Sequence, residues 1–169
     1  LHYSNYFYCD SAWLNRKENN FRAFSDVHIN VSDTLDIYSD SLNYHGSTRI
    51  ADLYGNVKLV DNRATLTTEH LTYDRNTDIA YYYTGATIVS DSNVLVSRIG
   101  HYYTDRKEAH FRDSVVLTNP DYVMNSDTLR YNTASKTAWF EGPSNIVGEE
   151  DSIYCEDGWY NTELDVSRL

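Results

Sequence analysis

The sequence predicts an all-β protein: an elongated, open-ended β-jelly roll of bent antiparallel strands, built from about six two-strand repeats of 29 residues. Three observations predict this fold class. Residue types recur at a fixed period, the apolar residues are mostly of types that favour strands, and the links between apolar runs are short.

The period is clearest in two sets of anchor residues. Alanine recurs at a constant interval, at Ala51, Ala80, Ala109 and Ala138. A second anchor, usually tyrosine, recurs at nearly the same interval. Its members are Leu14, Tyr44, Tyr73, Tyr103, Tyr131 and Tyr160. A fixed period of this length indicates that one supersecondary unit is stacked repeatedly.

Composition limits the class of protein. Sixteen tyrosines and a single methionine among 169 residues, with many Val, Ile and Thr, favour strands over helices. The net charge of −11 argues against a nucleic-acid partner, and no run of 18 apolar residues predicts a membrane span. We expect residues 1–169 to form a single domain that is a fragment of a longer chain.

The strands follow in pairs along the chain. The first unit runs outward through 1–14, crosses a polar loop at 15–20 and returns through 21–31. The later outgoing strands are expected at 35–44, 66–73, 94–103, 122–131 and 153–160. The later returning strands are expected at 51–59, 80–89, 108–117, 137–146 and 164–169. Turns are expected at 32–33, 45–47, 61–62, 74–77, 90–93, 104–107, 119–121, 132–136 and 149–151. Such short links suit antiparallel hairpins and exclude parallel crossovers within one sheet.

Each long strand is expected to bend in its middle. On the outgoing strands the apolar parity switches, as between Leu35 and Leu42, which requires a bulge or a bend. On the returning strands Gly55, Gly85 and Gly142 supply bend points, with Asp113 in the equivalent slot of the remaining copy. Bent antiparallel strands fold over into two facing layers with an apolar interior.

Catalytic and metal-binding motifs are absent, so we expect no enzyme activity, no cofactor and no metal site. A recurring acid lies four residues before the second anchor, and Ile99 breaks the series. Its members are Asp10, Asp40, Glu69, Asp127 and Glu156. We interpret this row as bulge chemistry at the sheet rim rather than as a cation or polymer site. Cys9 and Cys155 occupy one repeat slot at opposite ends of the stack, too far apart for a disulfide, and are expected to be unpaired.

The internal face is the candidate binding site. Each of its residues alone is best explained as ordinary core, but the whole array could line a groove for long apolar chains. The residues expected to bind lipid are Leu42, Tyr44, Leu53, Val57, Leu59, Leu71, Tyr73, Tyr82, Val89, Tyr103, Phe111, Val115, Leu117, Leu129, Tyr131, Phe140 and Ile146.

A family resemblance rests on two motifs of the repeat. The element Gly55-Asn56-Val57-Lys58-Leu59, followed by Leu66-x-x-Glu69-x-Leu71-x-Tyr73-Asp74, resembles the repeat of the OstA-like family over roughly 35–160. That family includes the periplasmic bridge protein of lipopolysaccharide transport and the N-terminal domain of the outer-membrane lipopolysaccharide assembly protein. The resemblance implies a periplasmic location, acyl chains of lipopolysaccharide or a related glycolipid held in the interior, and head-to-tail stacking.

Unpaired strand edges at 1–14 and 153–169 are expected to pair with other bridge components or with a second copy. Two alternatives to a transport module remain open. One is a structural or adhesive β-solenoid at the cell surface with a filled core. The other is a parallel β-helix acting on polysaccharide, which the short hairpin links disfavour.

Overall fold

The computed structural model describes residues 6–32, 35–61, 64–164 and 166–169, which form fifteen strands and no helix. The strands are β1 (Tyr6–Tyr8), β2 (Ser11–Asn15), β3 (Asn20–Ser32), β4 (Leu35–His45), β5 (Ile50–Asp61), β6 (Thr65–Asp74), β7 (Ile79–Tyr82), β8 (Ala86–Ser90), β9 (Asn93–Ser97), β10 (Ile99–Tyr103), β11 (Glu108–Thr118), β12 (Tyr122–Asn132), β13 (Thr137–Gly148), β14 (Ser152–Asn161) and β15 (Val166–Arg168). The predictions of turns at 32–33 and 61–62 fall partly outside the described residues. In the part of the chain that is described, no helix is long and apolar enough to span a membrane.

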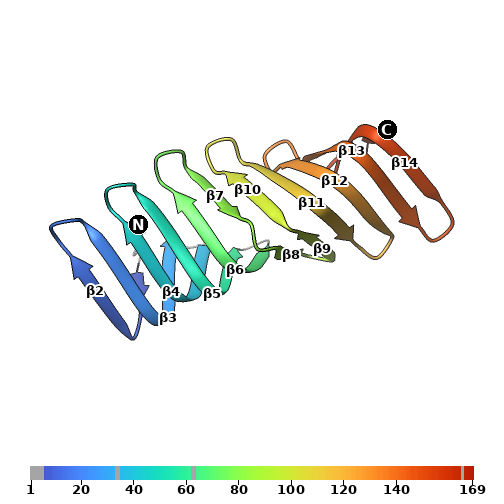
Figure 1. The fold of residues 1–169 in the computed structure, drawn as a ribbon. Helices are drawn as coiled ribbons and strands as arrows, with labels where there is room; N and C mark the ends of the chain where they lie inside the picture. The colour runs from blue at the N-terminus through green and yellow to red at the C-terminus, as the bar shows by residue number, and fades with distance from the viewer. Residues whose placement is uncertain (1–5, 33–34, 62–63, 165) are drawn as a thin grey trace.

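Every strand pair among the described residues is antiparallel, and each long strand pairs with the next long strand along the chain. The short strands make pairs that skip along the sequence: β1 with β3, β7 with β10, β8 with β6 and β9 with β11. The prediction of an all-β antiparallel protein is therefore confirmed, and the parallel β-helix alternative is wrong. The stack is elongated, with β1 and β2 at one end and β14 and β15 at the other (Figure 1).

The long strands bend in their middles, as predicted, and the sheet folds into two layers (Figure 1). The register shifts at each bend, for example between Tyr38 and Ser41 of β4. The backbone turns through positive φ at Gly55, Gly85 and Gly142, and at Asp113 in the remaining copy. Layer 1 contains β2, β7, β10, β15 and the halves of the long strands that pair with them. Layer 2 contains β1, β8, β9 and the other halves.

Three of the expected strands are broken rather than bent. The expected strand 1–14 is split into β1 and β2 at Cys9 and Asp10. The expected strands 80–89 and 94–103 are each split, into β7 with β8 and into β9 with β10. The breaks lie at residues 83–85 and at Arg98, and the two are joined by a hydrogen bond from the Gly85 backbone N–H to the Arg98 carbonyl (2.9 Å). The sheet therefore continues across this point through backbone contacts at the bend.

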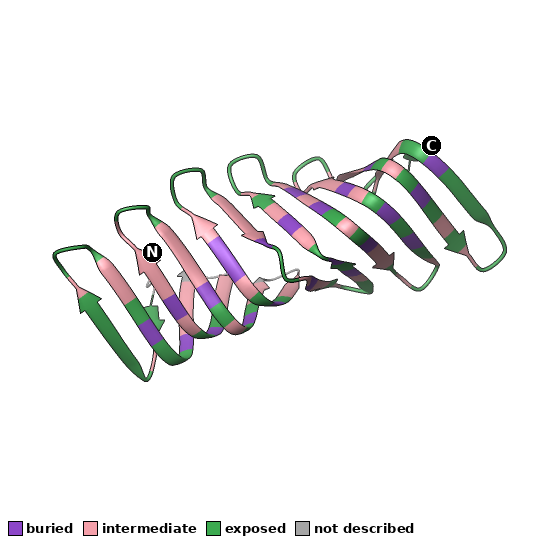
Figure 2. Cartoon of the chain, viewed as in Figure 1, coloured by how far each residue is buried: buried purple, intermediate pink, exposed green. Residues whose placement is uncertain are grey.

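Burial follows distance from the bends. The most buried side chains lie next to the bends, while the turns at the free ends of both layers are mostly exposed (Figure 2). The core forms two clusters, one from Ala23 to Ala86 and one from Leu95 to Cys155. Val27, Val57 and Val115 lie at the bends and are each only 1% exposed, so the vertex between the layers is filled by the protein's own side chains.

Candidate functional site: the inner face of the two layers

The inner face of layer 2 carries an unbroken row of aliphatic residues. Strand register places one residue from each strand in this row, which we call the aliphatic row: Ile29, Ile37, Leu59, Leu66, Ile88, Leu95, Leu117, Met124, Ile146 and Ile153. Most of these side chains are half-buried and pack against the core clusters. The row therefore extends over nearly the whole stack while keeping part of its surface accessible.

Layer 1 carries two inner rows at different distances from the bend. The row next to the bend is mostly buried and contains Leu42, Leu53, Leu71, Tyr82, Phe111, Leu129 and Phe140. The row nearer the turns alternates tyrosine with alanine: Tyr44, Ala51, Tyr73, Ala80, Tyr102, Ala109, Tyr131, Ala138 and Tyr160. We call the second one the Tyr/Ala row. Its alternation explains why both sequence anchors share one period.

Nine of the residues predicted to bind lipid are buried near the bends: Leu42, Leu53, Val57, Leu71, Tyr82, Phe111, Val115, Leu129 and Phe140. Six are half-buried further out: Tyr44, Leu59, Tyr73, Leu117, Tyr131 and Ile146. The half-buried residues are the ones that have surface left for a ligand.

Two predicted positions are wrong. Val89 is 43% exposed, and its neighbour Ile88 occupies the aliphatic row instead, because the bend at Gly85 shifts the side-chain parity. Tyr103 pairs with Ile79 and Glu108 on the outer side, where its ring contacts His110 (centroids 4.9 Å apart). Tyr102 is the true member of the repeat.

Tyr82 bridges the two layers at the centre of the molecule. It is 3% exposed, and its hydroxyl hydrogen-bonds the Ser97 hydroxyl at 2.6 Å. Its ring lies over Gly100, the residue opposite it in β10, so that a Cβ at Gly100 would overlap the ring. The Tyr82 ring thus fills the space beside Gly100 that the side chains of Leu71 and Leu129 fill at the equivalent positions of the neighbouring copies.

A row of buried hydroxyls shapes the bends, and sequence reasoning missed it. Ser39, Thr68, Ser97 and Ser126 recur at the period of the repeat. The three serines each donate a hydrogen bond to the carbonyl two residues on, at 3.0 to 3.3 Å, and the Thr68 hydroxyl donates to the Gly85 carbonyl at 2.7 Å. In each copy the position of the recurring acid lies directly after the hydroxyl residue, and these hydrogen bonds stabilise the kink in the strand there. The period alone could have revealed the row. Cys9 and Cys155 occupy the same slot in the terminal copies, and both are free thiols, as expected.

The acids after these hydroxyls lie on the outer side of the bends. Asp40 accepts a hydrogen bond from the Asn56 side chain at 3.0 Å, next to Gly55. The second anchor of this copy is Tyr102, not Tyr103, so the position four residues before it is Arg98 and not Ile99. Arg98 forms an ion pair with Asp113. At this bend Arg98 replaces the recurring acid and Asp113 replaces the recurring glycine, and the two replacements form one ion pair.

Comparison with known families decides the relationship. A family model described as OstA-like protein matches residues 1–127, which is more than half of the chain. The chain belongs to the OstA-like family. Among solved structures it is similar to LptH of Pseudomonas aeruginosa, described as the LptA homologous periplasmic component of the conserved lipopolysaccharide transport device. The TM-score is 0.46 and the identity 13%, over 78% of this chain and 77% of LptH. No curated protein matched the sequence.

The coupling between Arg98 and Asp113 in this OstA-like chain can be tested by placing the same two residue types at the equivalent positions of another bend. Gly55→Asp alone is expected to lower the free energy of unfolding by about 1–3 kcal/mol, because it places a Cβ at φ 72° and a second carboxylate beside Asp40. Adding Asp40→Arg should recover about 1 kcal/mol. Urea unfolding of both single variants and the double variant measures the coupling, and strictly additive effects would contradict it.

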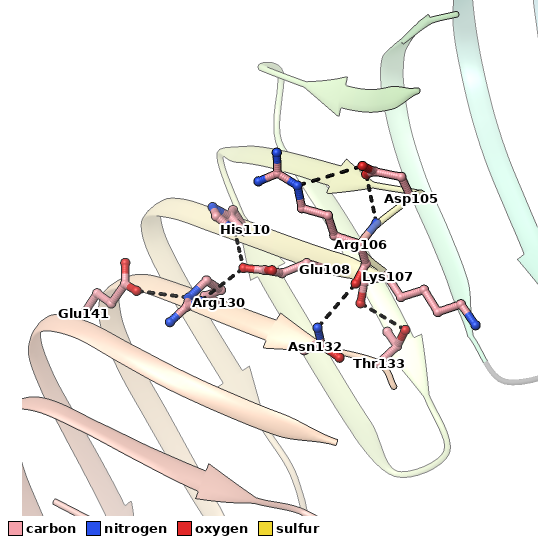
Figure 3. A network of polar contacts seen from close by, with 9 residues as sticks. All are labelled: Asp105, Arg106, Lys107, Glu108, His110, Arg130, Asn132, Thr133 and Glu141. Atoms are coloured by element: carbon pink, nitrogen blue, oxygen red, sulfur yellow. Dashed lines mark hydrogen bonds and ion pairs between the residues drawn. The ribbon is translucent and has the colours of Figure 1, made fainter. Parts of the chain in front are cut away.

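A polar network lies on the outer face of β11, β12 and β13 in layer 1 of this OstA-like chain (Figure 3). One Glu108 carboxylate oxygen lies 2.8 Å from His110 Nε2 and accepts a hydrogen bond from Arg130 at 3.3 Å. Arg130 also donates to Glu141 at 3.1 Å and lies 4.2 Å from the ring centre of Trp139. The bond with His110, and then those with Arg130, lower the pKa of Glu108 below its ordinary value. Among the described residues, no group of three metal-ligating side chains is present.

This pKa shift predicts a pH effect on stability. Because the pKa of Glu108 is lower in the folded than in the unfolded state, its contribution is present above the unfolded value of 4.5 and is lost as the pH falls through the folded value. Urea midpoints measured from about pH 6 to about pH 3 should fall less steeply for Glu108→Gln than for the parent. His110→Ala should flatten the profile in the same direction. Parallel profiles for all three proteins would contradict the assignment.

Proposed function

We propose that this chain is a non-enzymatic, periplasmic module of a bridge that carries lipopolysaccharide, or a related glycolipid, toward the outer membrane. The acyl chains lie against the inner face, between the aliphatic row and the Tyr/Ala row. The observation that carries the proposal is the aliphatic row, which is continuous along the stack and in which seven of the ten side chains are half-buried. Membership of the OstA-like family supports it.

We further propose that the domain is an open-ended jelly roll and one part of a longer assembly. In the described part of the chain, β1 and β2 pair only with β3, and residues 152–155 pair only with β13. Apolar side chains are exposed at these edges, including Phe7 and Trp13 at one end and Ile153 and Tyr154 at the other. Such edges suit docking of other bridge components or of a second copy.

Site-specific photo-crosslinking in cells tests the proposal. A photoreactive amino acid at Leu59, a half-buried member of the aliphatic row, should label lipopolysaccharide. Its neighbour Lys58 is exposed on the opposite face of the same strand and serves as the matched control. Leu117 and the exposed Thr118 form a second pair. Equal labelling at inner and outer positions would contradict lipid binding on the inner face.

The filled vertex favours a second candidate, a structural or adhesive β-solenoid. Val27, Val57 and Val115 fill the inner side of the bends, so a ligand would have to lie further out, where side chains are half-buried. The two candidates differ in one measurable respect. Mass spectrometry of the protein purified from its native envelope should find bound glycolipid for a transport module and none for a filled solenoid.

A further inference from the structure

The cations of this acidic chain gather at one edge of the molecule. Of its fourteen Lys and Arg residues, seven lie in the turns at the free end of layer 1: Arg16, Lys17, Arg49, Arg75, Arg106, Lys107 and Lys136. The same turns also carry four acids, Glu18, Asp78, Asp105 and Glu163. The described turns at the free end of layer 2 carry Asp91, Asp121, Glu149, Glu150 and Asp151 and no cation, and Arg63 falls outside the described residues. The two edges of the structure therefore differ in charge although the whole chain is negative.

Three of these cations occupy turn positions with an unusual backbone conformation. Arg49, Lys107 and Lys136 occupy one repeat slot and have positive φ angles of 58°, 55° and 53°. Asn, Asp and Gly tolerate this left-handed conformation best, and the other members of the slot, Asn19 and Asp78, follow that preference. A long basic side chain at such a position is retained at a conformational cost, which favours a function for its charge.

Hydrogen bonds between successive turns fix the spacing of these residues. The Thr133 backbone N–H and hydroxyl both donate to the Lys107 carbonyl, at 2.9 and 3.1 Å (Figure 3). The Thr162 N–H and hydroxyl bind the Lys136 carbonyl in the same way, and the Arg75 N–H binds the Arg49 carbonyl. Successive slots are two strands apart, about 10 Å. Lys107 and Lys136 are therefore about 10 Å apart, and Arg49 lies about 20 Å from Lys107 with Asp78 in the slot between them.

These charges remain available for a ligand. Within the described residues, Arg49, Lys107 and Lys136 form no ion pair. Several carboxylates of the same turns are engaged locally, since Asp74 accepts from the Asn76 N–H and Asp78 accepts from the Tyr73 hydroxyl, both at 2.8 Å. Each cation also lies two residues before an alanine of the Tyr/Ala row, so the charged edge borders the inner face directly.

We propose that Arg49, Lys107 and Lys136 bind the anionic phosphate groups of an amphiphile whose acyl chains lie on the inner face. This inference rests on the proposed lipid-binding function and adds where the head group lies. The described layer 2 turns carry acids and no cation and repel phosphates, which favours the layer 1 edge for the head groups. Binding through exposed charges is expected to weaken as the salt concentration rises.

A binding assay with two matched lipids tests the inference. The probes are fluorescent bis-phosphorylated lipid A and the same lipid with both phosphates removed, each dispersed below its aggregation threshold. The triple variant Arg49→Gln, Lys107→Gln, Lys136→Gln should bind the phosphorylated lipid about tenfold more weakly than the parent and the dephosphorylated lipid equally well. The control triple Lys58→Gln, Arg112→Gln, Arg168→Gln makes the same change in net charge away from this edge and should bind both lipids like the parent.

The outcomes separate the two proposals. Equal weakening in both triple variants, or no weakening in the edge variant, would overturn the head-group assignment while leaving binding of the dephosphorylated lipid as support for the inner face. Failure of the parent to bind either lipid would overturn both. Millimolar inorganic phosphate should not displace the phosphorylated lipid, and full displacement would show a simple phosphate site rather than a lipid head-group site.

Discussion

Replacing Tyr82 with alanine is expected to lower the free energy of unfolding by about 3–5 kcal/mol, the range for truncating a large buried aromatic residue. The ring is 3% exposed and covers Gly100, a position without a side chain of its own to fill the space. The change also removes the hydroxyl that bonds Ser97. Urea unfolding followed by tyrosine fluorescence or circular dichroism gives the measurement.

Two controls separate packing from hydrogen bonding at this site. Tyr82→Phe keeps the ring and should cost about 1 kcal/mol, since the Ser97 hydroxyl still donates to the Ile99 carbonyl. Tyr83→Ala removes the neighbouring ring, which is 52% exposed, and should cost less than the change at Tyr82. A loss at Tyr82 no larger than that at Tyr83 would show that the centre of the stack is loosely packed.

A carboxylate on the inner face should abolish lipid binding. Leu117→Asp places a charge in the aliphatic row, where acyl chains would have to cover it, and burial of an unpaired charge is expensive enough to lower affinity by more than a hundredfold. The measurement is retention of lipid by the purified protein. It needs a parallel urea titration, because Leu117 also packs against the core and its loss lowers stability.

Thr118→Asp is the matched control for this variant. It introduces the same charge one residue further along β11, on the opposite, exposed face, and should leave lipid retention unchanged. Equal retention in both folded variants would place the lipid somewhere other than the inner face. If Leu117→Asp does not fold, Leu117→Asn provides a polar change without the charge.

Much of this architecture follows from the period. The constant spacing of the anchors, the parity switch on outgoing strands and the mid-strand glycines predicted bent antiparallel strands, and the bends lie where Gly55, Gly85 and Gly142 predicted them. The errors arose where two adjacent residues fit one slot. Tyr102 and Tyr103 are both tyrosine and Ile88 and Val89 are both aliphatic, so the sequence could not choose between them.

Other features depend on contacts between strands. The ion pair between Arg98 and Asp113 could not be predicted, because taking Tyr103 as the anchor placed the position of the recurring acid at Ile99 and not at Arg98. The packing of Tyr82 on Gly100 requires the register of β7 against β10, which no local pattern encodes. The basic edge was masked by the net charge of −11, which averages over the two edges.

The bonds between successive turns also bear on how such a chain can change in length. Each copy carries its own kink and attaches to the next copy through the same contacts, at Arg49, Asp78, Lys107 and Lys136. Gene duplication or deletion of one whole copy would therefore leave every remaining joint intact. Each copy gained or lost would change the length of the stack by about 10 Å, the width of two strands.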